Sequence, residues 1–370
     1  MIHIIHFSSR PGGIEVLIPV FVKALPNYFF STFVIRKPNK DDANIYNVLN
    51  APTKFGSNNT IIALIKTFIF AYKYKDDKFH VFNIGPFFLL MLRLAGVKKL
   101  IYGIHGTIYW QNQKQKIIRK PFWWLAISKN YVFTSNSEYS KQKFLNQVYS
   151  KANIYLLYNP IDTTKFTISQ SQGVNIFPKF RIIYSGRLAN GKNLFVWLRI
   201  AALIKETRRD VVFEVFGEGP LKKELIHEAE NLGLGVSISF KGYTPNITQA
   251  YQNADLLIFL SEYESFGNVV VESILCGTPV IASAIPSMKE IFINYPEFIV
   301  ELDENLEQNV LKKIENIDNL KSLIPIVRKE FMERFSLEQH IQKLEKIYNS
   351  FNNQEPRIRN NESRTLNFEF

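Results

Sequence analysis

Short apolar runs alternate with amphipathic stretches over almost the whole length of this chain, and no other feature limits its possible folds as strongly. The apolar runs are rich in Ile, Val, Phe and Tyr, a composition typical of buried strands. The stretches between them carry the apolar spacing of helices. Repeated alternation of strand and helix predicts parallel sheets that are covered by helices on both faces.

The alternation occurs in two series, which a polar stretch at 163–178 separates. In the first series we expect strands at 2–7, 29–35, 80–84, 100–104, 131–135 and 153–157, and helices at 15–25, 87–94 and 138–147. In the second we expect strands at 181–185, 211–216, 236–240, 255–260, 279–282 and 298–301, and helices at 194–206, 221–232, 247–252, 269–275 and 336–351. Two such series predict an α/β chain of two doubly wound Rossmann-like domains that face one another. The expected divisions are an N-terminal domain over 1–162, a linker over 163–179, a C-terminal domain over 180–335, a last helix over 336–351 and a disordered tail over 352–370.

The composition agrees with a folded chain of 370 residues, a length typical of about two domains. Hydrophobic residues make up 46% and charged residues 21%, which excludes a disordered chain. Cys276 is the single cysteine, so an intrachain disulfide and a cysteine-built zinc site are excluded. The longest stretch without charged side chains, 273–288, is too short to span a bilayer. No secretory signal precedes the first apolar run, so the expected compartment is the cytoplasm.

The net charge of +12 is unevenly distributed along the chain. Residues 1–160 carry 21 Lys and Arg against 6 Asp and Glu, a net +15, whereas residues 161–370 carry a net −3. Such asymmetry indicates an anionic partner for the first half: nucleic acid, an anionic membrane surface or a phosphorylated substrate. A basic surface without a partner is the alternative. No helix-turn-helix, zinc or RNP signature supports nucleic-acid binding.

Two glycine-containing turns follow expected strands, where ligands bind in open α/β sheets. Gly12 and Gly13 follow the first strand, and such a pair lets the backbone and the next helix's amides approach a phosphate or a sugar. A tight strand–helix turn needs glycine anyway, so this signal is weak. Gly186 follows the strand at 181–185, and Arg187 and Lys192 then flank the start of a helix. Fixed cations beside helix-end amides suit a diphosphate, although surface charge is the alternative.

A third turn, Gly217-Glu218-Gly219-Pro220, contains a Gly-x-Gly sequence. Lys222 stands where a dinucleotide fingerprint would have its third glycine, so the turn is weak evidence for such a site. We expect Pro220 to be the first residue of a helix.

The most specific motif covers residues 262–272 and follows the most apolar strand of the second series. Gly267 is expected to open a helix that carries Glu272 on its inner face, and Glu264 lies in the preceding loop. A carboxylate on an apolar face is costly unless it is paired or liganded. Two carboxylates beside helix-end amides suit a polyhydroxylated ligand with a phosphate, because carboxylates accept from hydroxyls and amides donate to phosphate. A solvated turn with a structural Glu is the alternative.

These motifs resemble those of the retaining glycosyltransferases with the GT-B fold, specifically the nucleotide-sugar-dependent family 4. The residues that carry the resemblance are Pro11-Gly12-Gly13, His105-Gly106, Asn159-Pro160-Ile161-Asp162, Gly186-Arg187 with Lys192, Gly217-Glu218-Gly219-Pro220, and Glu264-Ser265-Phe266-Gly267 with Glu272. The resemblance extends to about residue 351 and is most specific in the second half. Two departures are Asn159-Pro160, where the family commonly has Asn-Gly, and Ala189-Asn190-Gly191 before Lys192, where Pro-Glu is frequent.

The resemblance implies a role for each matching residue. Arg187 and Lys192 would bind the donor diphosphate and stabilise it as leaving group, and Glu272 would hold the ribose hydroxyls. Glu264 would grip the transferred sugar together with helix-end amides. His105, otherwise a candidate core histidine, would lie beside the reacting sugar, and Gly13 would contact the diphosphate from the opposite domain. The expected catalytic residues are therefore His105, Arg187, Lys192 and Glu264, and the expected substrate-binding residues are Gly12, Gly13, Gly186, Phe266, Gly267, Asn268, Val269 and Glu272.

The implied activity is transfer of a hexose, with retention, from a UDP- or GDP-sugar to a lipid-linked glycan in bacterial surface polysaccharide synthesis. No cofactor and no metal are expected, because Arg and Lys neutralise the leaving charge. The alternatives are a nucleotide-sugar epimerase and a non-catalytic glycan-binding relative, against which the intact motifs argue. The base, the sugar, the acceptor and the oligomeric state cannot be read from the sequence.

A basic amphipathic stretch at 114–124 suggests how a lipid-linked acceptor could be reached. It combines four cations with two tryptophans, and we expect it to lie on the anionic inner face of the plasma membrane. A helix packed on its own domain is the alternative. The residues concerned are Lys114, Lys116, Arg119, Lys120, Trp123 and Trp124.

Overall fold

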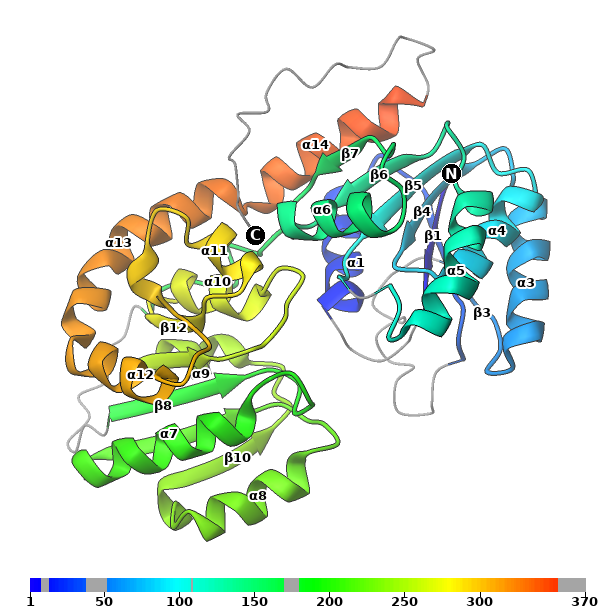
Figure 1. Cartoon of the computed structure of the whole chain (residues 1–370). Helices are drawn as coiled ribbons and strands as arrows, with labels where there is room; N and C mark the ends of the chain where they lie inside the picture. The colour runs from blue at the N-terminus through cyan, green and yellow to red at the C-terminus, as the bar shows by residue number, and fades with distance from the viewer. Residues whose placement is uncertain (8–12, 38–51, 108, 170–179, 352–370) are drawn as a thin grey trace. The chain divides into compact units, whose positions relative to one another are not determined.

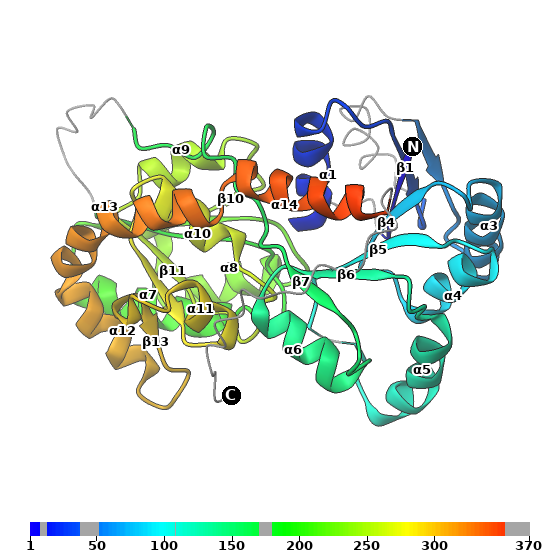
Figure 2. The ribbon, with the colours of Figure 1, turned by 90° about the horizontal axis from the view of Figure 1, so that it is seen from above.

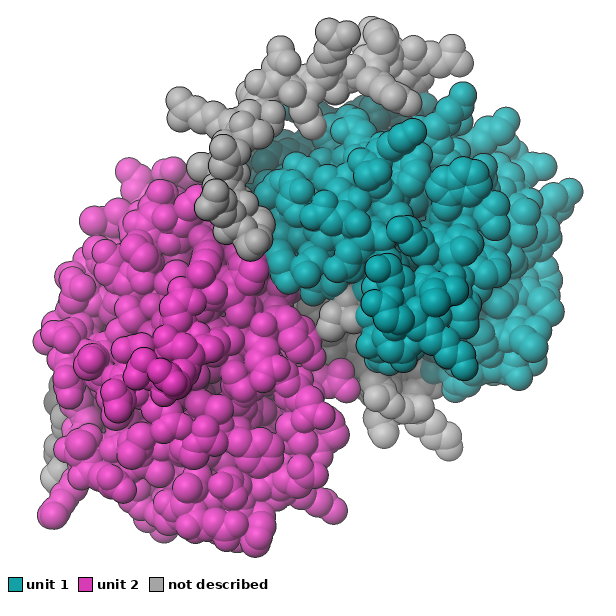
Figure 3. All heavy atoms as spheres, in the orientation of Figure 1, with its two compact units in different colours: residues 1–158, 338–370 teal, residues 159–337 magenta. Residues whose placement is uncertain are grey.

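The computed structural model describes residues 1–7, 13–37, 52–107, 109–169 and 180–351 (Figure 1). Contacts within the chain divide it into two compact units, which Figure 3 shows in teal and magenta. Unit 1 comprises residues 1–158 and 338–370, and unit 2 comprises residues 159–337. The expected tail at 352–370 and residues 170–179 of the expected linker lie outside the described residues.

The described part of unit 1 contains a seven-stranded parallel sheet in the order β3-β2-β1-β4-β5-β6-β7. Its strands are β1 (Ile2–His6), β2 (Phe30–Val34), β3 (Thr53–Phe55), β4 (Lys78–Phe82), β5 (Lys99–Ile104), β6 (Val132–Ser135) and β7 (Ile154–Leu156). Its helices are α1 (Gly13–Ala24), α3 (Thr60–Lys73), α4 (Pro86–Leu94), α5 (Gln113–Ala126), α6 (Glu138–Gln147) and α14 (Leu337–Ser350), which belongs to unit 1 from Glu338 on.

Helices cover both faces of this sheet, as its apolar strands require. Figure 2 shows α3, α4 and α5 on one side of the strands and α1 and α14 on the other. One buried cluster joins the strands to α3–α6, and a second joins them to α1 and α14. Tyr348 fastens α14 to the sheet, because its hydroxyl lies 2.8 Å from Nδ1 of His80 and its carbonyl accepts from Lys78 Nζ at 2.9 Å.

Unit 2 repeats the plan with six parallel strands in the order β10-β9-β8-β11-β12-β13 among its described residues. The strands are β8 (Phe180–Ser185), β9 (Val211–Phe216), β10 (Ile238–Gly242), β11 (Leu256–Phe259), β12 (Val280–Ser283) and β13 (Ile299–Val300). The helices are α7 (Leu194–Thr207), α8 (Lys222–Asn231), α9 (Ile247–Gln252), α10 (Asn268–Leu275), α11 (Pro286–Ile291), α12 (Leu306–Glu315) and α13 (Ile317–Arg334), with short 3-10 turns at Gly235–Ser237 and Pro296–Phe298.

The predicted fold class is confirmed: both units are parallel sheets with helices between the strands. Some boundaries were wrong. The strand expected at 80–84 is β4, which ends at Phe82 because Asn83 has a left-handed backbone (φ 50°). The strand expected at 236–240 starts at Ile238, since a 3-10 turn occupies the residues before it. Pro220 does not start a helix, because α8 begins at Lys222.

Candidate active site

In each sheet the strand order reverses at one point, and ligands of open α/β sheets bind beside the carboxyl ends of the strands there. In unit 2 the reversal lies between β8 and β11, which are neighbours in the sheet. The loops after these two strands contact each other, because Glu262 N donates to the carbonyl of Gly191 at 2.9 Å. Both loops carry predicted site residues, and the sheet therefore brings these residues to one edge.

The turn after β8 packs against the turn after β9, which contains Gly217 and Gly219. Gly186 N donates to the Phe216 carbonyl and Leu188 N to the Glu218 carbonyl, each at 3.0 Å, so the two turns run side by side. A Cβ on Gly217 would lie 1.9 Å from the carbonyl oxygen of Gly186. The Gly-x-Gly sequence thus permits a close backbone approach that holds the segment with Arg187.

The predicted cations occupy different surroundings. Arg187 is exposed, and its side chain makes no hydrogen bond or ion pair with another described residue. Lys192 forms an ion pair with Glu264 Oε1, which also accepts from Ser261 Oγ at 3.1 Å. An ammonium group has three protons, so Lys192 can still donate to an anion while it is paired. Oε2 of Glu264 has no partner among the described residues and can accept from a ligand hydroxyl.

The Ala189-Asn190-Gly191 segment, which departs from the family's usual sequence, packs against the loop after β11. Gly191 has a left-handed backbone (φ 79°), and a Cβ there would lie 2.4 Å from the Tyr263 ring. Tyr263 therefore packs directly on the glycine that precedes Lys192. This contact stabilises the loop at the point where its sequence differs from that of the family.

The start of α10 combines backbone donors with buried supports. Gly267 is its N-cap and its carbonyl accepts from Val270 N at 3.0 Å, whereas the amides of Asn268 and Val269 have no partner within the helix. Such amides favour anions. Asn268 Oδ1 accepts from Asn159 Nδ2 at 2.8 Å, and the buried Phe266 ring packs on Phe335 with centroids 5.3 Å apart. Phe266 can thus offer a ligand its backbone but not its ring, whereas Val269 is half-buried on the first turn.

Glu272, in the second turn of α10, is tied to the end of β8 through a tyrosine. The Tyr251 hydroxyl donates to Glu272 Oε2 at 3.1 Å and lies 3.2 Å from Ser185 Oγ. Tyr251 is fully buried. Burial raises the pKa of the Glu272 carboxyl to about 7, while the Tyr251 hydrogen bond and the charge of Lys165 act in the opposite direction. A carboxylate that titrates near neutral pH is a candidate binding group.

Two predicted residues, Gly13 and His105, belong to unit 1. Its strand order reverses between β1 and β4, and Gly13 starts α1 just after β1. His105 follows β5, where its amide donates to Asn83 Oδ1 at 3.0 Å, and its half-buried ring is 5.3 Å from the Phe82 ring. Gly12 lies outside the described residues.

Sequence reasoning assigned no supporting role to the residues that hold the predicted ones, although Asn159 belongs to a motif that carries the family resemblance. Tyr251 and Ser261 hold the two glutamates, Asn159 holds the start of α10, and Asn83 holds the His105 backbone. The signals of Tyr251, Ser261 and Asn83 were faint, because each is a single residue outside the recognised motifs. Among the described residues, no group of three or more His, Cys, Asp or Glu side chains is arranged to hold a metal ion.

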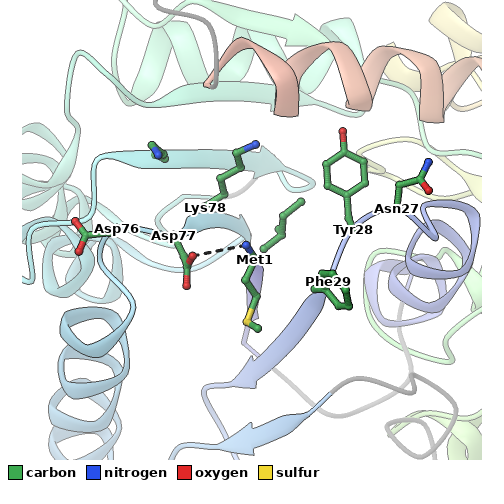
Figure 4. A pocket seen from close by; sticks show the side chains of 9 residues that line it. Met1, Asn27, Tyr28, Phe29, Asp76, Asp77 and Lys78 are labelled. Carbon is green, nitrogen blue, oxygen red and sulfur yellow. Dashed lines mark ion pairs between the residues drawn. The ribbon is translucent and has the colours of Figure 1, made fainter.

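A pocket of about 280 Å³ lies elsewhere in unit 1, at the amino ends of its strands (Figure 4). Met1, Lys78 and Lys99 line it at the starts of β1, β4 and β5, beside Tyr28. The Met1 amine pairs with Asp77 Oδ1 at 3.6 Å. Ligands bind at the opposite, carboxyl edge in this class of sheet, so we assign the pocket no role in the site.

The basic stretch at 114–124 lies in α5, and the expectation that both of its tryptophans are exposed was wrong for Trp123. Trp123 is buried, with its ring 5.7 Å from that of Tyr102 and 5.8 Å from that of Phe144. Trp124 is exposed, as expected. Successive residues point in directions about 100° apart on a helix, and Trp123 is turned toward the core while Trp124 faces outward. Within the described residues, no helix has the length and apolar character to cross a membrane.

Comparison with known proteins identifies the family of both halves. Residues 11–165 match the model of Glycosyltransferase Family 4, and residues 169–329 match that of Glycosyl transferases group 1. The N-acetylgalactosamine-N,N'-diacetylbacillosaminyl-diphospho-undecaprenol 4-alpha-N-acetylgalactosaminyltransferase of Campylobacter jejuni is 28% identical over 72% of this chain and 76% of its own length. The poly(ribitol-phosphate) alpha-N-acetylglucosaminyltransferase of Staphylococcus aureus is 24% identical over 50% of this chain, which spans only 39% of that relative.

The fold has equally clear counterparts. Anabaena HepE, solved in complex with UDP, superimposes with a TM-score of 0.77 over 94% of this chain and 99% of its own, at 19% identity. Sequence and fold therefore agree: the chain belongs to the group 1 and family 4 glycosyltransferases and has their GT-B fold.

Proposed function

We propose that this glycosyltransferase moves a hexose from a UDP- or GDP-sugar to a lipid-linked glycan, with retention of anomeric configuration, in bacterial surface polysaccharide synthesis. The observation that carries the proposal is the arrangement at the β8/β11 edge: a cation-bearing loop, two glutamates and the first turn of α10. This set offers cations and amides to a diphosphate and carboxylates to hydroxyls. We propose that Arg187, Lys192, Glu264 and Glu272 act there together with Gly186 and Gly267, and that His105, Gly12 and Gly13 of unit 1 also contact the substrates.

The proposed reaction begins with cleavage of the bond between the anomeric carbon and the diphosphate oxygen. The transition state is oxocarbenium-like, and Arg187 and Lys192 stabilise the charge that develops on the departing diphosphate. The acceptor hydroxyl forms the new bond on the face that the diphosphate leaves. Its proton departs with the nucleoside diphosphate, so charge and atoms balance. A screen of UDP- and GDP-sugars that monitors nucleotide release would identify the donor.

We expect the product to keep the anomeric configuration of the donor, and we expect turnover without a divalent metal. The names of both curated relatives specify α-linked products, which an α-linked donor yields by retention. Arg187 and Lys192 supply the neutralisation that a metal provides elsewhere. Proton NMR of the product, with and without a chelator, tests both statements. An inverted product would contradict the first, and activity that is lost on chelation and restored by magnesium would contradict the second.

We expect donor affinity to be highest above pH 7 and to fall as the pH falls through about 7. The cause is protonation of Glu272, whose carboxylate form accepts from the ribose hydroxyls in this proposal. The decline cannot exceed tenfold per pH unit for one proton. Tyr251→Phe removes a hydrogen bond that stabilises the carboxylate, so the inflection should move to higher pH.

Donor KM measured between pH 5.5 and 8.5 tests this pH dependence. Tyr263→Phe is the matched control, because its hydroxyl lies outside the Glu272 network. A Tyr251→Phe profile that superimposes on those of the wild type and the control would show that Tyr251 does not tune this carboxylate.

We also propose that the acceptor is lipid-linked and that the enzyme binds an anionic membrane. The Campylobacter relative is named for a diphospho-undecaprenol acceptor, and the first 160 residues carry a net +15. We propose that the enzyme works in the cytoplasm on the inner face of the plasma membrane, with α5 attracted to anionic lipid.

A further inference from the structure

Helix α3 is apolar on two opposite faces, although only one of them is covered by other described residues. Its inner face packs into the core of unit 1 through Ala63, Thr67, Phe70 and Ala71. Its outer face carries Ile61, Ile62, Ile65, Ile69 and Tyr72, whose exposed fractions range from 46% to 68%. A surface helix of a soluble protein normally places polar side chains on the outer face.

The outer residues form a continuous stripe. At 100° per residue they fall within an arc of roughly 100°, so they point in one direction along about three turns of the helix. Contiguous exposed apolar surface of this kind marks a place that another molecule or a membrane covers. The sequence did not reveal the stripe as a surface feature, because apolar side chains lie on both faces of α3 and only Lys66 and Lys73 are charged.

The charges around the stripe identify the occupant. Lys66 and Lys73 border it on α3, and Lys75 Nζ lies 4.8 Å from the centroid of the Tyr72 ring. Asp76 and Asp77 follow Lys75, and after them no Asp or Glu occurs before Glu138, so α4 and α5 carry no acidic residue. Figures 1 and 2 both show α3, α4 and α5 side by side. The outer face of α5 adds exposed Ile117 and Trp124 among its cations.

A second copy of the chain would bring the same cations against one another, so like-charge repulsion opposes self-association through this face. An anionic bilayer satisfies both features, because its headgroups attract Lys and Arg and its acyl boundary accepts Ile and Tyr. The combination of an apolar stripe with flanking cations is typical of helices that lie in the membrane interface.

We propose that α3 is an interfacial helix whose outer face enters the headgroup–acyl boundary of an anionic bilayer, while the cations of α5 supply the electrostatic attraction. This inference rests on the proposed membrane partner and adds a hydrophobic anchor to it. Salt screens the attraction between exposed charges but leaves apolar burial in place. Binding therefore persists in part at high ionic strength, which purely electrostatic binding does not.

The test is co-sedimentation with vesicles of neutral phosphatidylcholine and with vesicles that also contain anionic phosphatidylglycerol, at low and at high salt. Three variants are compared with the wild type: Ile65→Ser with Ile69→Ser in α3, the four α5 cations changed to Gln, and a control with Ile226→Ser and Ile326→Ser. The control replaces two exposed isoleucines of unit 2. Donor turnover in detergent-free buffer verifies that each variant is folded.

The α3 variant should bind anionic vesicles at least tenfold more weakly and should be fully released by salt. The α5 variant should keep a residual, salt-insensitive fraction, and the control should behave as the wild type. If the wild type binds no vesicles, the membrane partner and this inference both fail. If the wild type binds and the α3 variant binds equally well, the partner stands and this inference is overturned. A concentration-dependent dimer that the α3 variant abolishes would overturn it in favour of a second copy.

Discussion

Replacing Arg187 or Glu272 by Ala should lower kcat/KM at least a hundredfold. Each side chain is proposed to make a charge-assisted contact with the donor, and loss of one preorganised contact of this kind costs on the order of 3 kcal/mol. At 1.36 kcal/mol for each factor of ten, about 3 kcal/mol corresponds to a factor of more than a hundred. The initial rate of nucleotide release, measured at several donor concentrations, provides the comparison.

The two variants should differ in which kinetic constant changes. Arg187 is proposed to stabilise charge that develops on the leaving group, so Arg187→Ala should lower kcat. Glu272 is proposed to hold the ribose in substrate and transition state alike, so Glu272→Ala should mainly raise the donor KM.

Folding controls are available for both variants. The Arg187 side chain is exposed and has no partner among the described residues, so its loss should leave the melting temperature unchanged. Arg199→Ala is the matched control, an exposed arginine of α7 whose partner is Glu307. Glu272→Gln keeps the volume of the side chain that contacts Tyr251. Near-normal turnover by either alanine variant would remove that residue from the site.

The fold could be predicted from the sequence because most of its strands are buried on both faces, whereas its helices are not. β9, α6 and α9 have the predicted bounds, since turn residues or polar side chains flank each of them. α3 was missed because its outer face is as apolar as its inner face. β4 was displaced by two residues, because the left-handed backbone of Asn83, which ends it, has no reliable sequence signal.

The site could be predicted only as far as its motifs reach. Spacing placed Glu264 in a loop before a helix and Glu272 on that helix, as the structure has them. Spacing could not reveal that Lys192 pairs with Glu264, because 72 residues separate them and the contact depends on the neighbouring positions of β8 and β11. The same limit applies to the contact of Tyr251 with Glu272, since a lone tyrosine on a short helix carries no pattern.

Backbone contacts between glycine turns are a further class that sequence reasoning cannot reach. The Gly217 motif reads as a weak ligand fingerprint, yet the structure uses it to bring the β9 turn against the β8 turn. A side chain at position 217 would clash with the Gly186 carbonyl, which explains why the residue is glycine. This clash is seen in the structure and cannot be inferred from the residue type.

Replacing Gly217 by Ala should destabilise unit 2 by on the order of 3 kcal/mol and should weaken donor binding. Two effects combine: Gly217 has φ of 136°, which side chains rarely adopt, and the added Cβ would lie 1.9 Å from the Gly186 carbonyl oxygen. The atoms that the Cβ would meet belong to the backbone of Gly186 and not to a flexible side chain, so the turn before Arg187 must move. Displacement of that turn should carry the guanidinium away from the diphosphate.

Gly233→Ala is the matched control for this variant. Gly233 also has a positive φ, of 66°, but a Cβ there would meet no atom within 4 Å. Its substitution should therefore cost only the backbone strain, about 1 kcal/mol, and leave donor affinity unchanged. Urea denaturation of each variant, followed by calorimetric titration with the donor nucleotide, separates the two contributions. If Gly217→Ala were no more destabilising than Gly233→Ala, the close approach of the two turns would not be what this glycine serves, because strain alone would account for its cost.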